Sequence, residues 1–159
     1  LSPEAQAVIP QTGRLPGVDG KAKMSKSAGN AIALSASPDE IAAAVKAMFT
    51  DPNHLRIEDP GQVEGNVVFT YLDAFDEDCT ALEELKAQYR RGGIGDSKIK
   101  RRLEDILQAL IGPTRERRTQ LAKDPAYVLD VIRRGTEKAR SRTEATKREV
   151  VEGLGLFML

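Results

Sequence analysis

A chain of 159 residues with 40% hydrophobic content can bury a core, as one domain or as two small ones. Its single cysteine excludes an internal disulfide, and with only one histidine we expect no metal site. No apolar run approaches the roughly 18 residues that a membrane span needs, and the first residues lack the pattern of a signal peptide, so we expect a cytoplasmic protein without a membrane partner.

The formal net charge of zero conceals a segregation of charge along the chain. Residues 51–84 contain ten acidic residues and one basic residue, whereas residues 86–148 contain eighteen basic and eight acidic residues. The basic half is therefore a candidate surface for binding a polyanion. Solvated helix faces would have the same composition, so this second interpretation stays open.

Residues 21–30, which we call the lysine loop, follow a stretch that proline and glycine interrupt repeatedly. The loop contains almost nothing that could be buried. Its polar side chains include the ammonium groups of Lys23 and Lys26 and the hydroxyl groups of Ser25 and Ser27. Gly29 permits the positive φ that lets backbone N–H groups approach an anion. This composition predicts a clamp for a polyphosphate.

Short-range signals predict the elements that follow the loop. The apolar run at residues 31–34 predicts a short strand. Ser37 as N-cap, Pro38 at the first position and Glu40 three residues after the cap predict a helix over residues 38–49 that opens with a capping box.

Apolar residues at helical spacing predict four more helices. These begin near residues 66, 76–78, 96–97 and 124, and Asp96 or Ser97 is the expected cap of the third. We expect that helix to bend or end at Gly112–Pro113 before a basic continuation to residue 121. His54 lies in the loop of residues 53–64, where we expect a surface or packing role.

The pentapeptide of residues 23–27, KMSKS, followed by Ala-Gly-Asn, resembles the second signature of class I aminoacyl-tRNA synthetases, a mobile loop that holds the pyrophosphate of ATP. The flanking sequence narrows the resemblance. RLPGVDG at residues 14–20, TDPN at 50–53, GNVVFTYL at 65–72 and GGIGDSK at 92–98 are together similar to the C-terminal part of bacterial tryptophanyl-tRNA synthetases, a class Ic family.

The resemblance implies a mostly α chain. Residues 1–37 would be the end of a Rossmann-like α/β nucleotide-binding fold with the lysine loop and the short strand, and residues 38–159 a helical-bundle domain that binds the tRNA anticodon. It implies a homodimer, joined mainly through an N-terminal part, that activates tryptophan with ATP and Mg²⁺ and transfers it to tRNA(Trp). The residues implied to bind ATP are Lys23, Met24, Ser25, Lys26 and Ser27, with Lys26 and Lys23 as the catalytic cations.

Five basic residues beside a glycine-rich bend are the candidate tRNA contacts, namely Arg90, Arg91, Lys98, Arg101 and Arg102. A bend of this kind beside a basic helix start can present cations and backbone amides to phosphates. No HIGH-type signature occurs in the 159 residues, so we do not expect the chain to activate an amino acid alone. Two alternatives stay open: a tyrosyl-type class I synthetase, and a non-catalytic RNA-binding helical domain.

Overall fold

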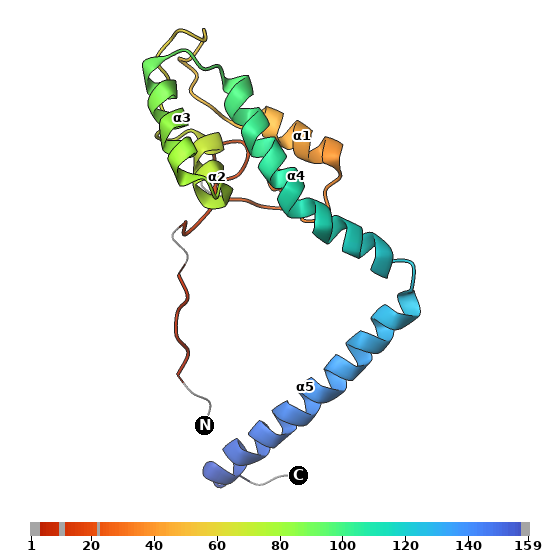
Figure 1. The fold of residues 1–159 in the computed structure, drawn as a ribbon. Coiled ribbons are helices and arrows are strands. Elements are labelled where there is room, and N and C mark those ends of the chain that lie inside the picture. Colours follow the sequence, from red (N-terminus) through yellow and green to blue (C-terminus); the bar gives the residue numbers. More distant parts are fainter. Residues whose placement is uncertain (1–3, 10–11, 22, 157–159) are drawn as a thin grey trace. The chain divides into compact units, whose positions relative to one another are not determined.

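The computed structural model describes residues 4–9, 12–21 and 23–156. Its helices are α1 (Pro38–Ala47), α2 (Val67–Phe75), α3 (Cys79–Arg91), α4 (Asp96–Leu121) and α5 (Pro125–Gly153) (Figure 1). The chain forms two compact units, residues 1–115 and residues 116–159, and α4 crosses the boundary between them. The predicted helical character is confirmed. The predicted domain boundary after residue 37 stays a prediction.

The predicted strand at residues 31–34 is wrong, and the described residues contain no strand. The backbone N–H of Ala36 donates to the carbonyl oxygen of Ala33 at 3.0 Å, so this segment closes a turn. A strand needs a neighbouring strand to receive its backbone hydrogen bonds, and the described chain supplies none here. Ile32 nonetheless packs against the core, which accounts for the apolar run.

The capping box at the start of α1 is confirmed. The hydroxyl of Ser37 accepts a hydrogen bond from the backbone N–H of Glu40 at 3.2 Å, and the Glu40 carboxylate accepts one from the N–H of Ser37 at 2.6 Å. The helix ends at Ala47, two residues before the predicted end. Met48 leaves the helical conformation and is buried in the core.

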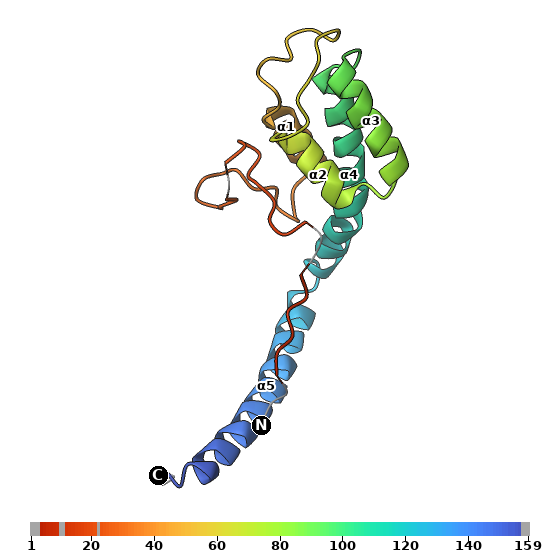
Figure 2. The same ribbon diagram turned by 90° about the vertical axis from the view of Figure 1, so that its left-hand side faces the viewer.

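One hydrophobic core holds the first unit together. Helices α2 and α3 lie side by side against the first half of α4 in both views (Figures 1 and 2). Tyr89 and Phe69 are the largest fully buried side chains, and their rings meet edge to face at 5.1 Å. Leu15 and Val18, which precede the lysine loop, pack on this same core. The segment that carries the loop is therefore anchored to the helices.

Helix α4 does not end at Gly112–Pro113 but continues to Leu121. A proline inside a helix removes one backbone hydrogen bond. Ile111 and Gly112 are buried at this turn, and the guanidinium of Arg115 donates to the carbonyl oxygen of Ala36 at 2.9 Å. These contacts hold the turn in helical form despite the proline.

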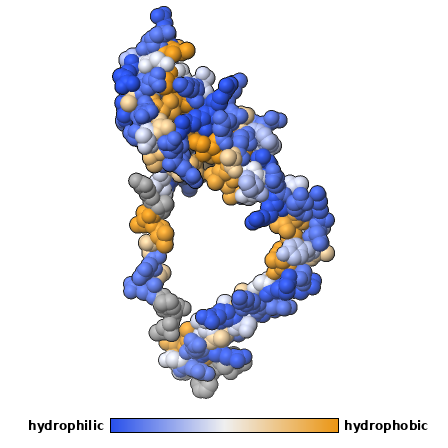
Figure 3. Space-filling view, in the orientation of Figure 1, coloured by the Kyte–Doolittle hydropathy of each residue, from blue (hydrophilic) through white to orange (hydrophobic). Residues whose placement is uncertain are grey.

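Helix α5 dominates the second unit. The Asp124 carboxylate caps it by accepting a hydrogen bond from the N–H of Tyr127 at 2.9 Å, as the sequence predicted. None of its residues is buried, and apolar residues such as Leu129 and Ile132 are exposed. Figure 3 shows hydrophobic and hydrophilic residues mixed along this helix. No helix in the described part of the chain has both the length and the apolar character needed to cross a membrane.

Candidate functional site

The tip of the lysine loop is a tight turn over residues 25–29. The backbone N–H of Ala28 donates to the carbonyl oxygen of Ser25, and that of Gly29 to the carbonyl oxygen of Lys26, both at 3.2 Å. Gly29 has a φ of 65°, as the sequence predicted, and this conformation is unfavourable for residues with a side chain. The turn therefore projects Lys26, Ser27 and Ala28 as one exposed group.

Two of the three cations of the loop are available to a ligand, whereas the third, Lys21, pairs with the Asp19 carboxylate at 3.6 Å. Lys23 and Lys26 are both exposed, and within the described residues neither ammonium group has a hydrogen bond or an ion pair. The hydroxyl oxygens of Ser25 and Ser27 lie 2.8 Å apart. This set of two positive charges and two hydroxyls can bind an anion with several oxygens, such as a polyphosphate.

Asn30, the last residue of the loop, is buried and only 3% exposed. Its side-chain oxygen accepts a hydrogen bond from the N–H of Ser25 at 2.8 Å. Its side-chain nitrogen donates to the carbonyl oxygen of Lys23 at 3.1 Å and to the carboxylate of Asp19 at 3.0 Å. From the sequence alone, Asn30 is only the last residue of the motif that begins with KMSKS. A polar residue that ends a cationic loop and precedes an apolar run was the available signal.

Two further contacts fix the segment before the loop. The hydrogen bond from Asn30, aided by the N–H of Lys21, lowers the pKa of Asp19 despite partial desolvation. The hydroxyl of Tyr71 on α2 donates to the carbonyl oxygen of Pro16 at 2.8 Å and lies 3.5 Å from the sulfur of Met24. Burial raises the pKa of Tyr71, so its hydroxyl stays a donor at neutral pH.

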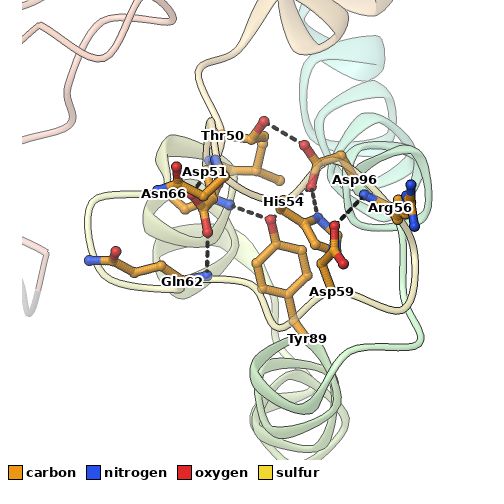
Figure 4. A network of polar contacts seen from close by, with 11 residues as sticks. Thr50, Asp51, His54, Arg56, Asp59, Gln62, Asn66, Tyr89 and Asp96 are labelled. Carbon is orange, nitrogen blue, oxygen red and sulfur yellow. Dashed lines mark hydrogen bonds and ion pairs between the residues drawn. The ribbon is translucent and has the colours of Figure 1, made fainter.

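A second polar cluster centres on Asp96, the first residue of α4 (Figure 4). Its carboxylate accepts hydrogen bonds from the hydroxyls of Thr50 at 2.5 Å and Tyr89 at 2.7 Å, and lies 3.0 Å from Nδ1 of His54. Desolvation by burial acts to raise the pKa of Asp96, but the hydrogen bonds from Thr50, Tyr89 and His54 outweigh it and lower the pKa. Burial, together with the charge of Asp96, raises the pKa of Tyr89.

This cluster organises the loop between α1 and α2. Its backbone is held further by Asp51, whose carboxylate accepts hydrogen bonds from the N–H groups of Asn53 and Gln62, both at 2.8 Å (Figure 4). The predicted packing role of His54 is confirmed, since its side chain is 2% exposed and meets the Tyr89 ring at 4.6 Å. The contacts of Asp96 are therefore mainly structural.

The candidate tRNA residues fall into two groups. Lys98, Arg101 and Arg102 line one groove of about 390 Å³ on α4 with Asp76 and other residues. Arg102 binds the Asp76 carboxylate through two hydrogen bonds of 2.6 and 3.1 Å, whereas Lys98 and Arg101 are exposed.

Arg90 and Arg91 form the other group, at the end of α3. Arg90 pairs with Glu64 at 2.6 Å on the surface, and Arg91 is exposed. We expected the glycine-rich bend to present its backbone amides to phosphates. Two of these amides, those of Gly92 and Gly93, are instead bonded within the protein. The N–H of Gly92 donates to the carbonyl oxygen of Tyr89, and that of Gly93 to the carbonyl oxygen of Ile57.

No cluster of three or more histidine, cysteine or acidic residues that could hold a metal ion occurs among the described residues.

Comparisons with known proteins agree on one group. A family model described as tRNA synthetases class I (W and Y) matches residues 2–112. The tryptophan–tRNA ligase of Clostridium longisporum is 54% identical over 155 residues, covering 96% of this chain and 46% of the relative. That of Streptococcus pneumoniae serotype 4 is 47% identical over 158 residues with the same coverage. The chain thus spans about half the length of the curated relatives it matches.

Solved structures give the same result. A tryptophanyl-tRNA synthetase from Campylobacter jejuni, complexed with ADP and tryptophan, is 27% identical with a TM-score of 0.74, covering 95% of this chain and 46% of that one. The tryptophanyl-tRNA synthetase from Giardia lamblia is 30% identical with a TM-score of 0.59, covering 67% of this chain and 27% of that one.

Proposed function

Because the chain belongs to the class I tRNA synthetases of the W and Y type, we propose that it is the C-terminal part of a tryptophan–tRNA ligase. The full-length enzyme would activate tryptophan with ATP, which enters with Mg²⁺, and transfer the amino acid to tRNA(Trp). This part supplies the lysine loop and helices that contact the tRNA. The names of its relatives support tryptophan over tyrosine as the amino acid.

One observation carries the proposal: two exposed ammonium groups without partners among the described residues stand on a loop whose base is fixed. In activation, the carboxylate of the amino acid attacks the α-phosphorus of ATP, and the bond from that phosphorus to the β-phosphate bridging oxygen breaks. Negative charge grows on the departing pyrophosphate. Lys26, with Lys23, would neutralise this charge, while the hydroxyls of Ser25 and Ser27 and the backbone around Met24 complete the contact.

The experiment is Lys26→Ala in the full-length enzyme, followed by tryptophan-dependent exchange of pyrophosphate into ATP. Since the cation acts on charge that develops in the transition state, we expect kcat to fall by about 10²-fold or more, with a much smaller change in the KM for ATP. Lys46→Ala, which removes an exposed lysine of α1, is the matched control and should leave kcat unchanged. Equal losses in the two variants would contradict the role of Lys26.

The same assay separates the remaining alternatives. A tyrosyl-type enzyme would support exchange with tyrosine and not with tryptophan. A non-catalytic RNA-binding domain would support no exchange with either amino acid, and Lys26→Ala would then have no rate to change.

The basic surface of α3 and α4 is the proposed site for tRNA. Arg91, Lys98 and Arg101 are its best placed residues because they are exposed, whereas Arg90 and Arg102 must first leave their acidic partners. We further propose a cytoplasmic homodimer joined through the N-terminal part, a proposal that rests on the family alone. Light scattering of the full-length enzyme tests the dimer.

A further inference from the structure

We propose that Asn30 is a positioning residue for the lysine loop: its side-chain amide fixes the backbone on both sides of Met24, so that Lys26 starts from a defined position. This inference rests on the proposed function of the loop and assigns a role to a side chain that does not itself reach the pyrophosphate.

The side-chain amide of Asn30 forms the same two hydrogen bonds with the loop that a peptide group of a neighbouring strand would form. It accepts from the N–H of Ser25 at 2.8 Å and donates to the carbonyl oxygen of Lys23 at 3.1 Å, so it replaces the partner that an adjacent strand would supply. The carbonyl oxygen of Asn30 itself accepts from the N–H of Val18 at 3.0 Å. One buried residue thus joins the start of the lysine loop to the turn that precedes it.

The chemistry of the partners fixes which way the amide points. The carboxylate of Asp19 and the carbonyl oxygen of Lys23 only accept hydrogen bonds, and the N–H of Ser25 only donates one. If the amide turned over, its oxygen would face two acceptors and its nitrogen a donor. Because the side chain is buried, such mismatches would be poorly compensated by water. The three partners together therefore hold the amide in one orientation.

The side-chain contacts of Asn30 stop at Ser25 and do not reach the turn beyond it. Among the contacts of the described residues, residues 26–29 are held by the two turn hydrogen bonds and by the hydrogen bond between the hydroxyls of Ser25 and Ser27. All three lie within residues 25–29. The loop is thus divided into a fixed base at residues 23–25 and a short movable tip that carries Lys26. A fixed base shortens the segment that must find its place when the nucleotide binds, which lowers the entropy lost at that step.

The test uses three variants of the full-length enzyme: Asn30→Asp, Asp19→Asn and the double variant. Asn30→Asp keeps the acceptor for Ser25 but loses both donated bonds and opposes Asp19 with a second carboxylate. Asp19→Asn alone can still accept from Asn30. The double variant restores the hydrogen bond between the two side chains in the reverse direction, with residue 19 as donor.

We expect Asn30→Asp to lower kcat for pyrophosphate exchange by about tenfold or more, with the KM for ATP changed by less than about threefold. Asp19→Asn should remain close to the parent enzyme. The double variant should recover part of the loss, at least about threefold, because it removes the opposed carboxylates. A residue with a merely structural role would change the amount of folded enzyme and not kcat per folded molecule.

Hydrogen exchange of the same proteins gives a second readout that does not depend on activity. Asn30→Asp should speed exchange at the amide of Ser25, and leave the core amides of α3 as protected as in the parent. Should Asn30→Asp fail to fold, Gly17→Ala replaces it, because a Cβ at Gly17 would lie 2.7 Å from Cγ of Asn30 and would displace the amide without a change of charge.

The outcomes separate this inference from the function on which it rests. Suppose that Lys26→Ala abolishes pyrophosphate exchange, while Asn30→Asp changes neither kcat nor the rate of hydrogen exchange at the amide of Ser25. Asn30 then does not position the loop, and the proposed function stands. If neither substitution changes kcat, both proposals fail together.

Discussion

The hydroxyl of Tyr71 donates a hydrogen bond to the carbonyl oxygen of Pro16, 2.8 Å away and 55 positions earlier in the chain. This bond joins the middle of α2 to the turn that leads into the lysine loop. The same hydroxyl lies 3.5 Å from the sulfur of Met24, inside the loop. Helix α2 therefore holds the loop through Tyr71. Asn30 holds it independently, by joining it to the preceding turn.

Tyr71→Phe tests this support. The substitution leaves the carbonyl oxygen of Pro16 without its donor in a partly buried place, so we expect the free energy of unfolding to fall by about 1–2 kcal/mol. Urea unfolding measures the change. Tyr127→Phe, which removes a hydroxyl from a half-exposed residue of α5, is the control and should change the stability by less than about 0.5 kcal/mol. A similar loss in both variants would contradict the role of the Pro16 contact.

Asp96→Asn tests the cluster at the start of α4. The folded-state pKa of Asp96 lies below its ordinary value, so the carboxylate stabilises the fold above the unfolded-state pKa of about 3.9, and this contribution is lost as the pH falls through the folded-state value. We expect the substitution to destabilise the protein at pH 7 and to make the difference from the parent shrink toward pH 2. Urea unfolding across that range measures it.

Asp105→Asn is the matched control for this pH dependence, because it removes an exposed carboxylate from the same helix. Its stability should follow that of the parent at every pH. A pH-independent difference between Asp96→Asn and the parent would show that the charge of Asp96 contributes nothing.

Ser37→Ala tests the capping box of α1. The backbone N–H of Glu40 would lose its acceptor, and the free energy of unfolding should fall by about 1 kcal/mol. Ser35→Ala, at an exposed position two residues earlier, should leave the unfolding midpoint in urea unchanged. Equal midpoints for the two variants would mean that the cap is dispensable.

Charge removal along α4 separates phosphate contacts from structural ion pairs. For tRNA binding, log K falls linearly as log salt rises. Lys98→Gln and Arg101→Gln should each make this slope less steep by about 0.7–0.9, the value for one phosphate contact, and leave stability unchanged. Arg102→Gln should instead reduce stability, because it leaves the Asp76 carboxylate, whose side chain is 5% exposed, without its partner. Filter binding of tRNA at several salt concentrations measures the slopes. Unchanged slopes would remove Lys98 and Arg101 from the contact surface.

Features that depend on residues close together in the chain could be predicted from the sequence, whereas contacts between residues far apart in the chain could not. The capping box of α1 lies within four residues, so its pattern was sufficient to predict it. Asp96 was expected to cap a helix, yet its carboxylate binds Thr50, which lies 46 positions earlier. A carboxylate suits both roles, and only the packing of α4 against the preceding loop selects one.

The same distinction holds for the lysine loop: some of its features could be predicted from the sequence and others could not. Its cations and the positive φ of Gly29 followed from residue type, because an exposed loop keeps its intrinsic chemistry. The strand expected after it did not form, since strand structure depends on a neighbour and not on the run itself. The contacts of Asn30 were also missed, because a buried amide has no periodic pattern that would reveal it.

The tip of the lysine loop can be displaced without exposing any core side chain, since Ser27 and Ala28 are already on the surface. Under the proposed function, the melting temperature and the rate at which the loop closes on the nucleotide would therefore be set by different residues. Substitutions at these two positions would change the rate of closure while the melting temperature stays constant, so turnover and thermal stability could diverge between related enzymes.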